Sequence, residues 1–363
     1  MFKNLQNDKI MTFFINLLFT LSICYIIGRT YSRNKFSNGA LFTLLFCFGF
    51  FWIIICGGQY YVGTDYPTYL ELFHGDNIEY YRFKNEYLFY YIVIIFNYIG
   101  VYGQSLFYIF YLINFIFLFL ILKRLDLKFI FIFLLLYICY SNIFNNQLNM
   151  LRQATAIHIC TYAGVLYSEG KYKYTSLWII ISSLIHISSL CMFSLFLFRN
   201  IIKIKTIHLK IVLIISTVGM FFASSNMFSN FSNFLPLYYQ TYLEREPTDS
   251  SFMTLITKLI FIPLFWISCN INYNYSYNKK ILYNIGFLGY CLKLLLLKVP
   301  VINRLSDYYI ILSIFPIYFL LEYLFKCGKK FLFFTICICL IAIYGLKTIL
   351  LPQAEYLYNS IYF

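Results

Sequence analysis

Four ionisable residues lie in or beside apolar stretches of this chain, where a charge is costly and therefore invites a functional explanation. They are an aspartate, two arginines and a histidine: Asp65, Arg152, His186 and Arg304. A carboxylate can deprotonate or orient a hydroxyl, and a guanidinium can grip a phosphate through two parallel hydrogen bonds. A histidine titrates near neutrality, so it can carry a proton or donate to a phosphate oxygen. The set suits sugar transfer from a lipid pyrophosphate, with arginines stabilising the leaving group without a metal.

Asp65 and Arg152 also have structural interpretations. Asp65 follows Gly63, which permits a tight turn, and it precedes a proline, so its carboxylate could serve a turn or cap a helix. Arg152 opens an apolar span and could reach lipid headgroups instead of a substrate. On a helix it shares a face with Ala156 and Ala163, small residues that let a neighbouring helix approach closely. Both interpretations stay open for these two residues.

His186 and Arg304 have structural alternatives of the same kind. His186 has serines four and three positions before it and three positions after it, so they would line its face of a helix and could bind its ring. Arg304 could simply pair with Asp307, which lies three positions later. The functional alternatives are a proton carrier at His186 and a phosphate contact at Arg304.

The composition indicates an all-α polytopic membrane protein. Only 12% of the 363 residues are charged, against about 25% in soluble proteins, and the mean hydropathy is +0.73. Lys and Arg outnumber Asp and Glu by 28 to 14, which is typical of cytoplasmic loops facing anionic lipid. No basic stripe accompanies a soluble domain, so nucleic acid is not an expected partner. The 11 cysteines form no C-x-x-C pair and lie mostly in apolar runs, which argues against a disulfide framework or a metal site.

Apolar runs predict about 11–13 transmembrane helices in a single domain over residues 1–363, because ~20 residues cross the hydrocarbon core. The first run shows no small-residue cleavage site, so it is expected to be a retained anchor. Two long loops interrupt the runs. One at 57–85 is expected to be extracytoplasmic, and the second, at 225–252, is expected to be periplasmic and is rich in aromatic residues that could contact sugar rings or form an interfacial belt. The candidate spans are 11–27, 40–56, 86–101, 105–122, 128–144, 151–167, 174–198, 206–224, 253–270, 281–298, 305–325 and 331–351.

Five basic loops do not fit strict alternation of these spans. The positive-inside rule places all of them in the cytoplasm, yet three spans separate the first from the second and three separate the second from the third. At least two segments must therefore return to their own side or lie in the interface, and 86–101 and 174–198 are the candidates. Non-helical backbone at membrane depth lines a cavity or is buried in protein, so such breaks indicate a site. The loops are GRTYSRNK, KRLDLK, RNIIKIK, NKK and KCGKK.

Several motifs occur in an order that resembles the EpsG family of Wzy-type polysaccharide polymerases. The segment V-G-T-D-Y-P-T-Y at 62–69 resembles that family's G-x-D-x-x-x-Y element, which is usually followed by an acid that opens the next apolar segment. A central R-Q-x-x-A block, a short basic loop and an apolar helix ending in H-x-S follow, and a late arginine precedes an aromatic-rich span. In this chain the elements after the first are Glu86, Arg152 with Gln153 and Ala156, EGKYKY, His186 with Ser188, and Arg304 with Tyr308 and Tyr309.

The resemblance implies an inner-membrane polymerase of surface polysaccharide, O-antigen or capsule, with its active site facing the periplasm. Such enzymes move a growing glycan from undecaprenyl pyrophosphate to the non-reducing end of a lipid-linked repeat unit. The resemblance also implies a GT-C-like membrane glycosyltransferase fold with re-entrant or interfacial segments, no cofactor and no metal, and a chain-length regulator as a further partner. The implied residues are Asp65 and His186 for catalysis, Arg152 and Arg304 for pyrophosphate, and more weakly Glu86, Gln153, Tyr69 and Tyr308.

Three other functions fit a polytopic membrane protein. A flippase for lipid-linked sugars predicts two pseudo-symmetric halves with matching broken helices, and no such repeat is visible. An acyltransferase modifying sugars would centre on His186 and leave Arg152 and Arg304 without a role. A scaffold of an export complex predicts that changing Asp65 alters assembly and leaves polymer length unchanged. The polymerase hypothesis also requires all four ionisable residues to reach one membrane face, which the loop count leaves open.

Overall fold

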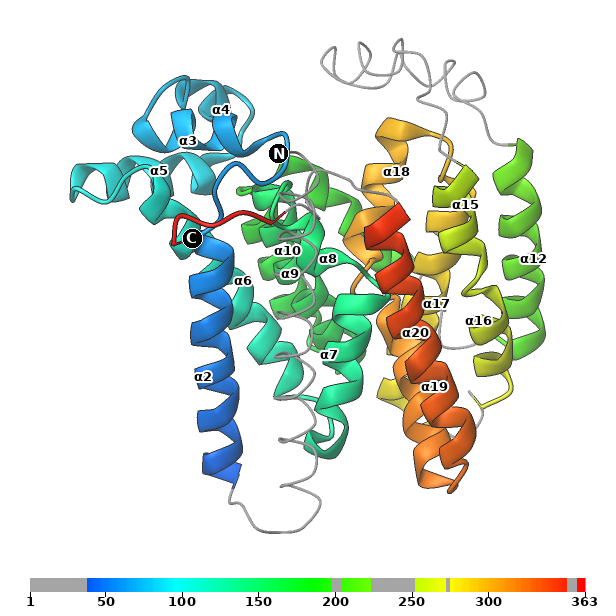
Figure 1. Ribbon diagram of the computed structural model, residues 1–363. Helices are drawn as coiled ribbons and strands as arrows, with labels where there is room; N and C mark the ends of the chain where they lie inside the picture. Colours follow the sequence, from blue (N-terminus) through cyan, green and yellow to red (C-terminus); the bar gives the residue numbers. More distant parts are fainter. Residues whose placement is uncertain (1–37, 198–203, 223–251, 272–274, 351–357, 363) are drawn as a thin grey trace. The chain divides into compact units, whose positions relative to one another are not determined.

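The computed structural model describes residues 38–197, 204–222, 252–271, 275–350 and 358–362 (Figure 1). The expected anchor at 11–27, the basic loop that follows it and most of the 225–252 loop lie outside the described residues. The chain divides into two compact units, one over 1–163, 172–190 and 334–363 and the other over 164–171 and 191–333. Each unit is described by itself.

The first unit is mostly helical and carries Asp65 in the segment between α2 and α3. Apart from one bridge between Gln59 and Ser360, its described residues are helical or in turns. Its helices are α2 (Asn38–Gly57), α3 (Tyr66–His74), α4 (Glu79–Phe83), α5 (Tyr87–Tyr98), α6 (Gln104–Leu122), α7 (Ile130–Cys139), α8 (Ile143–Asn146), most of α9 (Leu151–Ser168), α10 (Tyr172–Ser183) and most of α20 (Lys330–Leu350), with short 3₁₀ turns η1 (Leu127–Phe129) and the start of η2 (Ile187–Phe193).

Helices α2 and α6 pack side by side (Figure 1) and define the length of this unit. At 1.5 Å per residue the 19 residues of α6 extend about 28 Å, close to the hydrocarbon thickness of a bilayer. At one end of α6 the Gln104 amide donates to the carbonyls of Gly57 at 2.5 Å and Gln59 at 2.9 Å, and at the other end the chain enters the basic loop KRLDLK. The segment carrying Asp65 and this basic loop therefore lie at opposite ends of α6.

Helix α5 starts and finishes at the same end of α6. Its 12 residues extend only about 18 Å, and Figure 1 shows it running across the end of α2. The chain after α5 returns to α3, where the Gly103 N–H donates to the Phe73 carbonyl at 3.0 Å, and α6 begins at the next residue. Both ends of 86–101 thus lie at one end of α6, as expected of a segment that returns to its own side or lies in the interface.

The second predicted break, within 174–198, is also present. Helix α10 ends at Ser183 and η2 begins at Ile187, so the chain turns at 184–186. The Leu184 carbonyl at this turn accepts from the N–H groups of Leu88 at 2.8 Å and Phe89 at 3.2 Å, the first turn of α5. The carbonyl that follows α10 thus accepts from the first N–H groups of α5, so these backbone groups at two helix ends are paired. Buried breaks in helices require such pairing.

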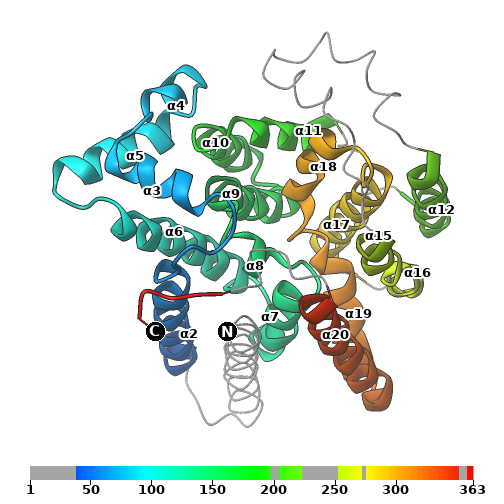
Figure 2. The same ribbon diagram turned by 45° about the horizontal axis from the view of Figure 1, so that its top comes forward.

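Small residues bring α9 and α10 together, as their spacing predicts. The Ser182 hydroxyl donates to the Ala156 carbonyl at 3.0 Å, and the Thr175 hydroxyl donates to the Ala163 carbonyl at 3.3 Å. Hydroxyl-to-carbonyl bonds between helices need close backbones, which alanine permits. Figure 2, seen toward the end that carries α3 and α5, shows α9 and α10 beside each other.

The second unit is a bundle around α17, which packs against α12 and α19, and α16 packs against the same two helices. The Glu322 carboxylate is paired with Lys279 and Lys326, so the NKK and KCGKK loops meet at one end. Asp307 pairs with Lys293, 14 residues further along α17 than Lys279. Its helices are α11 (Ser194–Leu197), α12 (Thr206–Phe222), α15 (Phe252–Leu259), α16 (Ile262–Cys269), α17 (Tyr277–Leu295), α18 (Pro300–Ser306) and α19 (Ile314–Lys326), with the 3₁₀ turn η6 (Asp307–Tyr309).

Three stretches within the described residues are long and apolar enough to cross a membrane: Gln104–Leu122, Asn303–Lys326 and Lys330–Thr348. Shorter apolar helices, such as those at Ile130–Cys139 and Thr206–Phe222, accompany them. The predicted all-α membrane architecture with interfacial or re-entrant segments is confirmed. The count of about 11–13 crossing helices and the GT-C-like relationship stay predictions.

Candidate functional site

The Asp65 turn is fixed by an asparagine from the start of α9. Gly63 has φ +78°, and a Cβ added there would lie 2.5 Å from the Asn149 Oδ1 atom, so only glycine fits this turn. The same Oδ1 atom accepts from the Asp65 N–H at 2.9 Å and from the Thr64 hydroxyl at 3.4 Å. Asp65 occupies the N-cap position of α3, yet its side chain makes no capping hydrogen bond and is exposed. Its carboxylate is thus presented outward by a rigid turn.

Tyr69 connects this turn to Arg152. It lies one helical turn after Asp65, where its N–H donates to the Asp65 carbonyl at 2.9 Å. Its buried hydroxyl accepts from the Arg152 backbone N–H at 3.4 Å. Asn149, two residues before α9, and Arg152 in its first turn therefore together hold α3, and these contacts join the V-G-T-D-Y-P-T-Y segment to the R-Q-x-x-A block.

The Arg152 guanidinium is enclosed by aromatic rings and a carboxylate. Its Nη1 atom pairs with the Glu86 Oε2 atom, and the two side chains are only 16% and 3% exposed. Its Cζ atom lies 4.2 Å from the ring centre of Tyr81, 5.1 Å from that of Phe89 and 5.9 Å from that of Tyr69. The Nε atom has no hydrogen-bond partner within the part of the chain that the structure describes. We call these five residues the Arg152 cluster.

Burial decides the ionisation of the groups around the guanidinium. Desolvation raises the pKa of the Glu86 carboxyl above its ordinary value, although the Arg152 guanidinium and the Ile187 N–H act in the opposite direction. Burial likewise raises the pKa of the Tyr69 and Tyr81 hydroxyls, and the Arg152 charge only partly opposes it. Both hydroxyls therefore stay protonated near neutral pH, so they can donate hydrogen bonds and do not serve as bases.

His186 lies at the helix break beside this cluster. Its backbone N–H donates to the Ser182 carbonyl at 2.9 Å, which ends α10, and its side chain is half-buried. The N–H of the next residue, Ile187, donates to the Glu86 Oε1 atom at 3.3 Å. Glu86 thus binds Arg152 with one oxygen and the break with the other. The hydroxyl of Ser182, predicted as a partner for the histidine ring, instead donates to Ala156 on α9.

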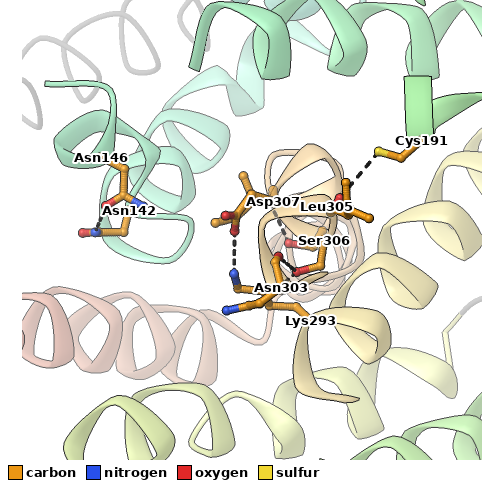
Figure 3. Close-up of polar contacts among 10 residues, drawn as sticks. Asn142, Asn146, Cys191, Lys293, Asn303, Leu305, Ser306 and Asp307 are labelled. Atoms are coloured by element: carbon orange, nitrogen blue, oxygen red, sulfur yellow. Dashed lines mark hydrogen bonds and ion pairs between the residues drawn. The ribbon is translucent and has the colours of Figure 1, made fainter. Parts of the chain in front are cut away.

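Arg304 and Tyr308 belong to the second unit. Arg304 is exposed in the last turn of α18, and Tyr308 is buried in η6. Asp307 pairs with Lys293, and the Ser306 hydroxyl donates to the Asn303 carbonyl at 2.5 Å, so the turn after α18 is tied to α17 (Figure 3). The Cys191 thiol donates to the Leu305 carbonyl at 3.7 Å in the same view.

The first unit gathers most of the predicted site residues at one end of α6 and α9. Asp65, Tyr69, Glu86 and Arg152 are joined by the contacts above, and His186 adjoins them through its neighbour. Gln153, the next residue on α9, is buried and belongs to the helix packing. The exposed Asp65 carboxylate thus lies one helical turn from Tyr69, whose hydroxyl meets the backbone of Arg152 in the first turn of α9. Within the described residues no set of three His, Cys, Asp or Glu side chains is placed to hold a metal ion.

Sequence reasoning missed the carboxamides that hold this site together. Asn149 fixes the Asp65 turn, and Gln104 accepts from the Tyr66 hydroxyl at 2.5 Å while binding the chain that follows α2. A signal was present, because SNIFNNQLNM at 141–150 places five carboxamide side chains in ten residues between two apolar spans. Such density at membrane depth is costly unless the groups bind backbone or each other.

Together the helices and this polar end define an all-helical, multi-pass membrane protein with an outward-facing carboxylate beside a buried arginine. The chain belongs to the EpsG family, whose sequence pattern matches residues 41–360, nearly its whole length. This membership places it among membrane proteins of polysaccharide biosynthesis. No curated protein and no solved structure matches the chain.

Proposed function

We propose that the chain is a membrane glycosyltransferase that polymerises undecaprenyl-pyrophosphate-linked oligosaccharide units into a surface polysaccharide, O-antigen or capsule, at the periplasmic face of the inner membrane. The observation that carries the proposal is the outward-facing carboxylate of Asp65, held through Tyr69 next to the Arg152 cluster and the His186 break. An enzyme that joins a sugar hydroxyl to a lipid-anchored donor needs an accessible base within a positively charged surrounding.

The charge distribution supports a periplasmic site. The positive-inside rule places KRLDLK in the cytoplasm, and this loop lies at the end of α6 opposite to Asp65. In the second unit, the NKK and KCGKK loops meet at Glu322, whereas Asp307, three residues after Arg304, pairs with Lys293 about 21 Å further along α17. The same rule therefore favours the periplasmic side for both Asp65 and Arg304.

The proposed reaction is a single glycosyl transfer. The hydroxyl oxygen of the acceptor unit bonds to the anomeric carbon of the donor glycan, and the bond from that carbon to pyrophosphate breaks. The pyrophosphate leaves with the electron pair, and Asp65 accepts the hydroxyl proton, with His186 as the alternative base. Arg152 and Arg304 stabilise the pyrophosphate charge. Because Arg152 is already paired with Glu86, it acts mainly through its field, while the exposed Arg304 is suited to direct contact.

The test is product formation by the purified protein with a lipid-pyrophosphate-linked repeat unit from the source strain, with EDTA present. Asp65→Asn, Arg152→Ala, His186→Ala and Arg304→Ala are compared with the unsubstituted chain, and thermal unfolding checks that each is folded. Asp76→Asn is the matched control, because Asp76 is an exposed carboxylate of the same loop outside the cluster.

A ladder that survives EDTA and Asp76→Asn but disappears with Asp65→Asn would support a metal-independent polymerase. If the folded, unsubstituted protein makes no ladder from its cognate unit, the proposal is wrong, and transport or acyl transfer becomes the better hypothesis.

A further inference from the structure

Helix α5 exposes one continuous apolar face. Its buried side contains Phe89, Tyr90 and Val93, of which Phe89 packs against α3, α4 and α6. Its other side is exposed at positions spaced by three or four residues, as a single helical stripe requires. We call this the α5 stripe, and it consists of Tyr87, Tyr91, Ile94, Ile95 and Tyr98, of which Tyr98 is 92% exposed.

The position of α5 limits what can cover this stripe. Both ends of the helix lie at the same end of α6, so α5 does not run through the bilayer with its neighbours. Helices α2 and α6 expose apolar side chains such as Phe46, Phe50 and Ile116, as lipid-facing helices do. A helix that crosses the end of such a pair lies at the depth of the lipid headgroups.

The chemistry of the stripe matches that depth. It has no charged residue, and three of its five members are tyrosines, the side chain that membrane proteins favour at the boundary between headgroups and acyl chains. The charged residues before the helix are already engaged within the protein, since Arg82 pairs with Glu79 at 3.7 Å and Lys84 lies 4.2 Å from the ring centre of Tyr80. Amphipathic helices of this composition lie in the interface plane with their apolar face in the acyl boundary.

We propose that the α5 stripe is a membrane-docking surface that lies in the interface of the outer leaflet, parallel to the bilayer plane. The proposal does not depend on the polymerase reaction, since it concerns a contact with bulk lipid. If the polymerase proposal also holds, the interface sets the depth of the site, because α5 begins next to Glu86 of the Arg152 cluster.

The test measures the depth of the stripe residue by residue. Tyr87→Trp, Tyr91→Trp and Tyr98→Trp are placed singly in the full chain, which is reconstituted into phosphatidylcholine vesicles brominated either near the headgroup or near the acyl chain end. Tyr61→Trp is the matched control, because Tyr61 is an exposed tyrosine at the same end of the unit but in the loop before α3. Fluorescence of the unsubstituted protein, which has three tryptophans, is subtracted.

The proposal predicts that the tryptophan fluorescence at the three stripe positions is quenched to the same extent. Quenching should be strongest by lipid brominated near the headgroup and weak by iodide dissolved in the water. A crossing helix would instead show depth increasing steadily from position 87 to 98, over about 16 Å, and this would overturn the proposal. Protection from both bromine and iodide would also overturn it, since that pattern indicates a protein partner or a second copy.

A second measurement needs no substitution. A bilayer-dissolved diazirine is photolysed with the unsubstituted protein, and labelled peptides are identified by mass spectrometry. The proposal predicts label on the peptide that contains 87–98, and its absence there while α2 and α6 are labelled would refute the membrane contact.

Discussion

The pair of Glu86 and Arg152 should behave as a desolvated ion pair whose two halves are not equivalent. Both side chains are nearly withdrawn from solvent, and each would leave an opposite charge behind if it were replaced alone. Arginine cannot lose its proton within a protein, whereas a buried carboxyl can become neutral by taking one up. Because burial raises the pKa of Glu86 even beside Arg152, the fold tolerates the neutral carboxyl, which glutamine imitates. We therefore expect Arg152→Met to destabilise the fold more than Glu86→Gln does near neutral pH.

The magnitudes follow from the burial. Glu86→Gln keeps the shape of the neutral carboxyl and an acceptor for the Ile187 N–H, so we expect a change of about 1 kcal/mol or less in the free energy of unfolding. Arg152→Met leaves the carboxylate without its partner, for which we expect a loss of about 3–5 kcal/mol near neutral pH. Arg152→Met removes the charge that opposes the raised pKa of Glu86, so that pKa rises further in the folded state. A carboxyl with a raised folded-state pKa contributes most below its unfolded value, about 4.3, and its contribution is lost as the pH rises through the folded pKa. The cost of Arg152→Met should therefore shrink as the pH is lowered toward about 4.3.

Denaturant unfolding in detergent micelles at two pH values measures both costs. The double variant Glu86→Met with Arg152→Met completes the cycle, and it should recover most of the stability because two apolar side chains often replace a buried ion pair at little cost. Thioether contacts with the rings of Tyr81 and Phe89 favour this recovery. Equal, pH-independent losses in the two single variants, with no recovery in the double, would show that the pair is solvated and that the reasoning is wrong.

Three further substitutions test the supports of the site. Asn149→Leu removes the acceptor of the Asp65 N–H and should loosen the turn by about 0.5–1.5 kcal/mol, so that product formation slows if the polymerase proposal holds. Asn149→Asp retains the acceptor and should restore most of the rate. Gly63→Ala should cost at least about 1–2 kcal/mol of stability, because φ is +78° and the new Cβ would meet Asn149; thermal unfolding measures it. Gln104→Leu strands two carbonyls and should lower the free energy of unfolding by about 1–3 kcal/mol for each buried group left unpaired, measured in micelles.

Each of these predictions has its own control. Asn146→Leu is the control for Asn149, since Asn146 is a neighbouring carboxamide that accepts from Asn142 at 2.7 Å and does not support the turn. Gly170→Ala is the control for Gly63→Ala, because Gly170 has a similar φ of +76° but open space around it. Its loss of stability measures backbone strain alone, and the additional loss at Gly63 measures the clash with Asn149. An unchanged rate in Asn149→Leu, equal losses at the two glycines, or full stability in Gln104→Leu would contradict the corresponding argument.

The helical architecture and its interruptions could be predicted from the sequence because they depend on apolar periodicity and charge alone. The mismatch between five basic loops and alternating spans located two irregular segments, and the structure has α5 and the 184–186 break there. Ala156 and Ala163 predicted a closely packed neighbour of α9 without indicating which helix, and the structure places α10 there through hydroxyl-to-carbonyl contacts.

The roles of individual polar residues could be predicted less well, because they depend on partners far away in the chain. The pairing of Arg152 with Glu86 joins residues 66 positions apart, and no local pattern specifies which carboxylate a buried arginine meets. Likewise, Asp65 takes the N-cap position that its proline neighbour suggests, yet its side chain makes no capping hydrogen bond, and Pro67 at the second helical position has no N–H to donate. The C-terminal residues offered no signal, although Tyr358 donates to the Ile55 carbonyl at 2.6 Å.

Glu86 contacts three parts of the fold that lie far apart in the sequence: the start of α5, α9 and the segment after the helix break. It precedes the first residue of α5, its Oε2 atom pairs with Arg152 on α9, and its Oε1 atom accepts from Ile187 after the helix break. A shift of α5 relative to α9 would therefore strain or break a buried ion pair, and a shift at the break would leave the Ile187 N–H without its acceptor. Because both losses are costly away from water, these elements are expected to move as one body. The lipid-facing helix, the buried arginine and the His186 turn thus share one depth, which an enzyme acting on a lipid-anchored substrate would need.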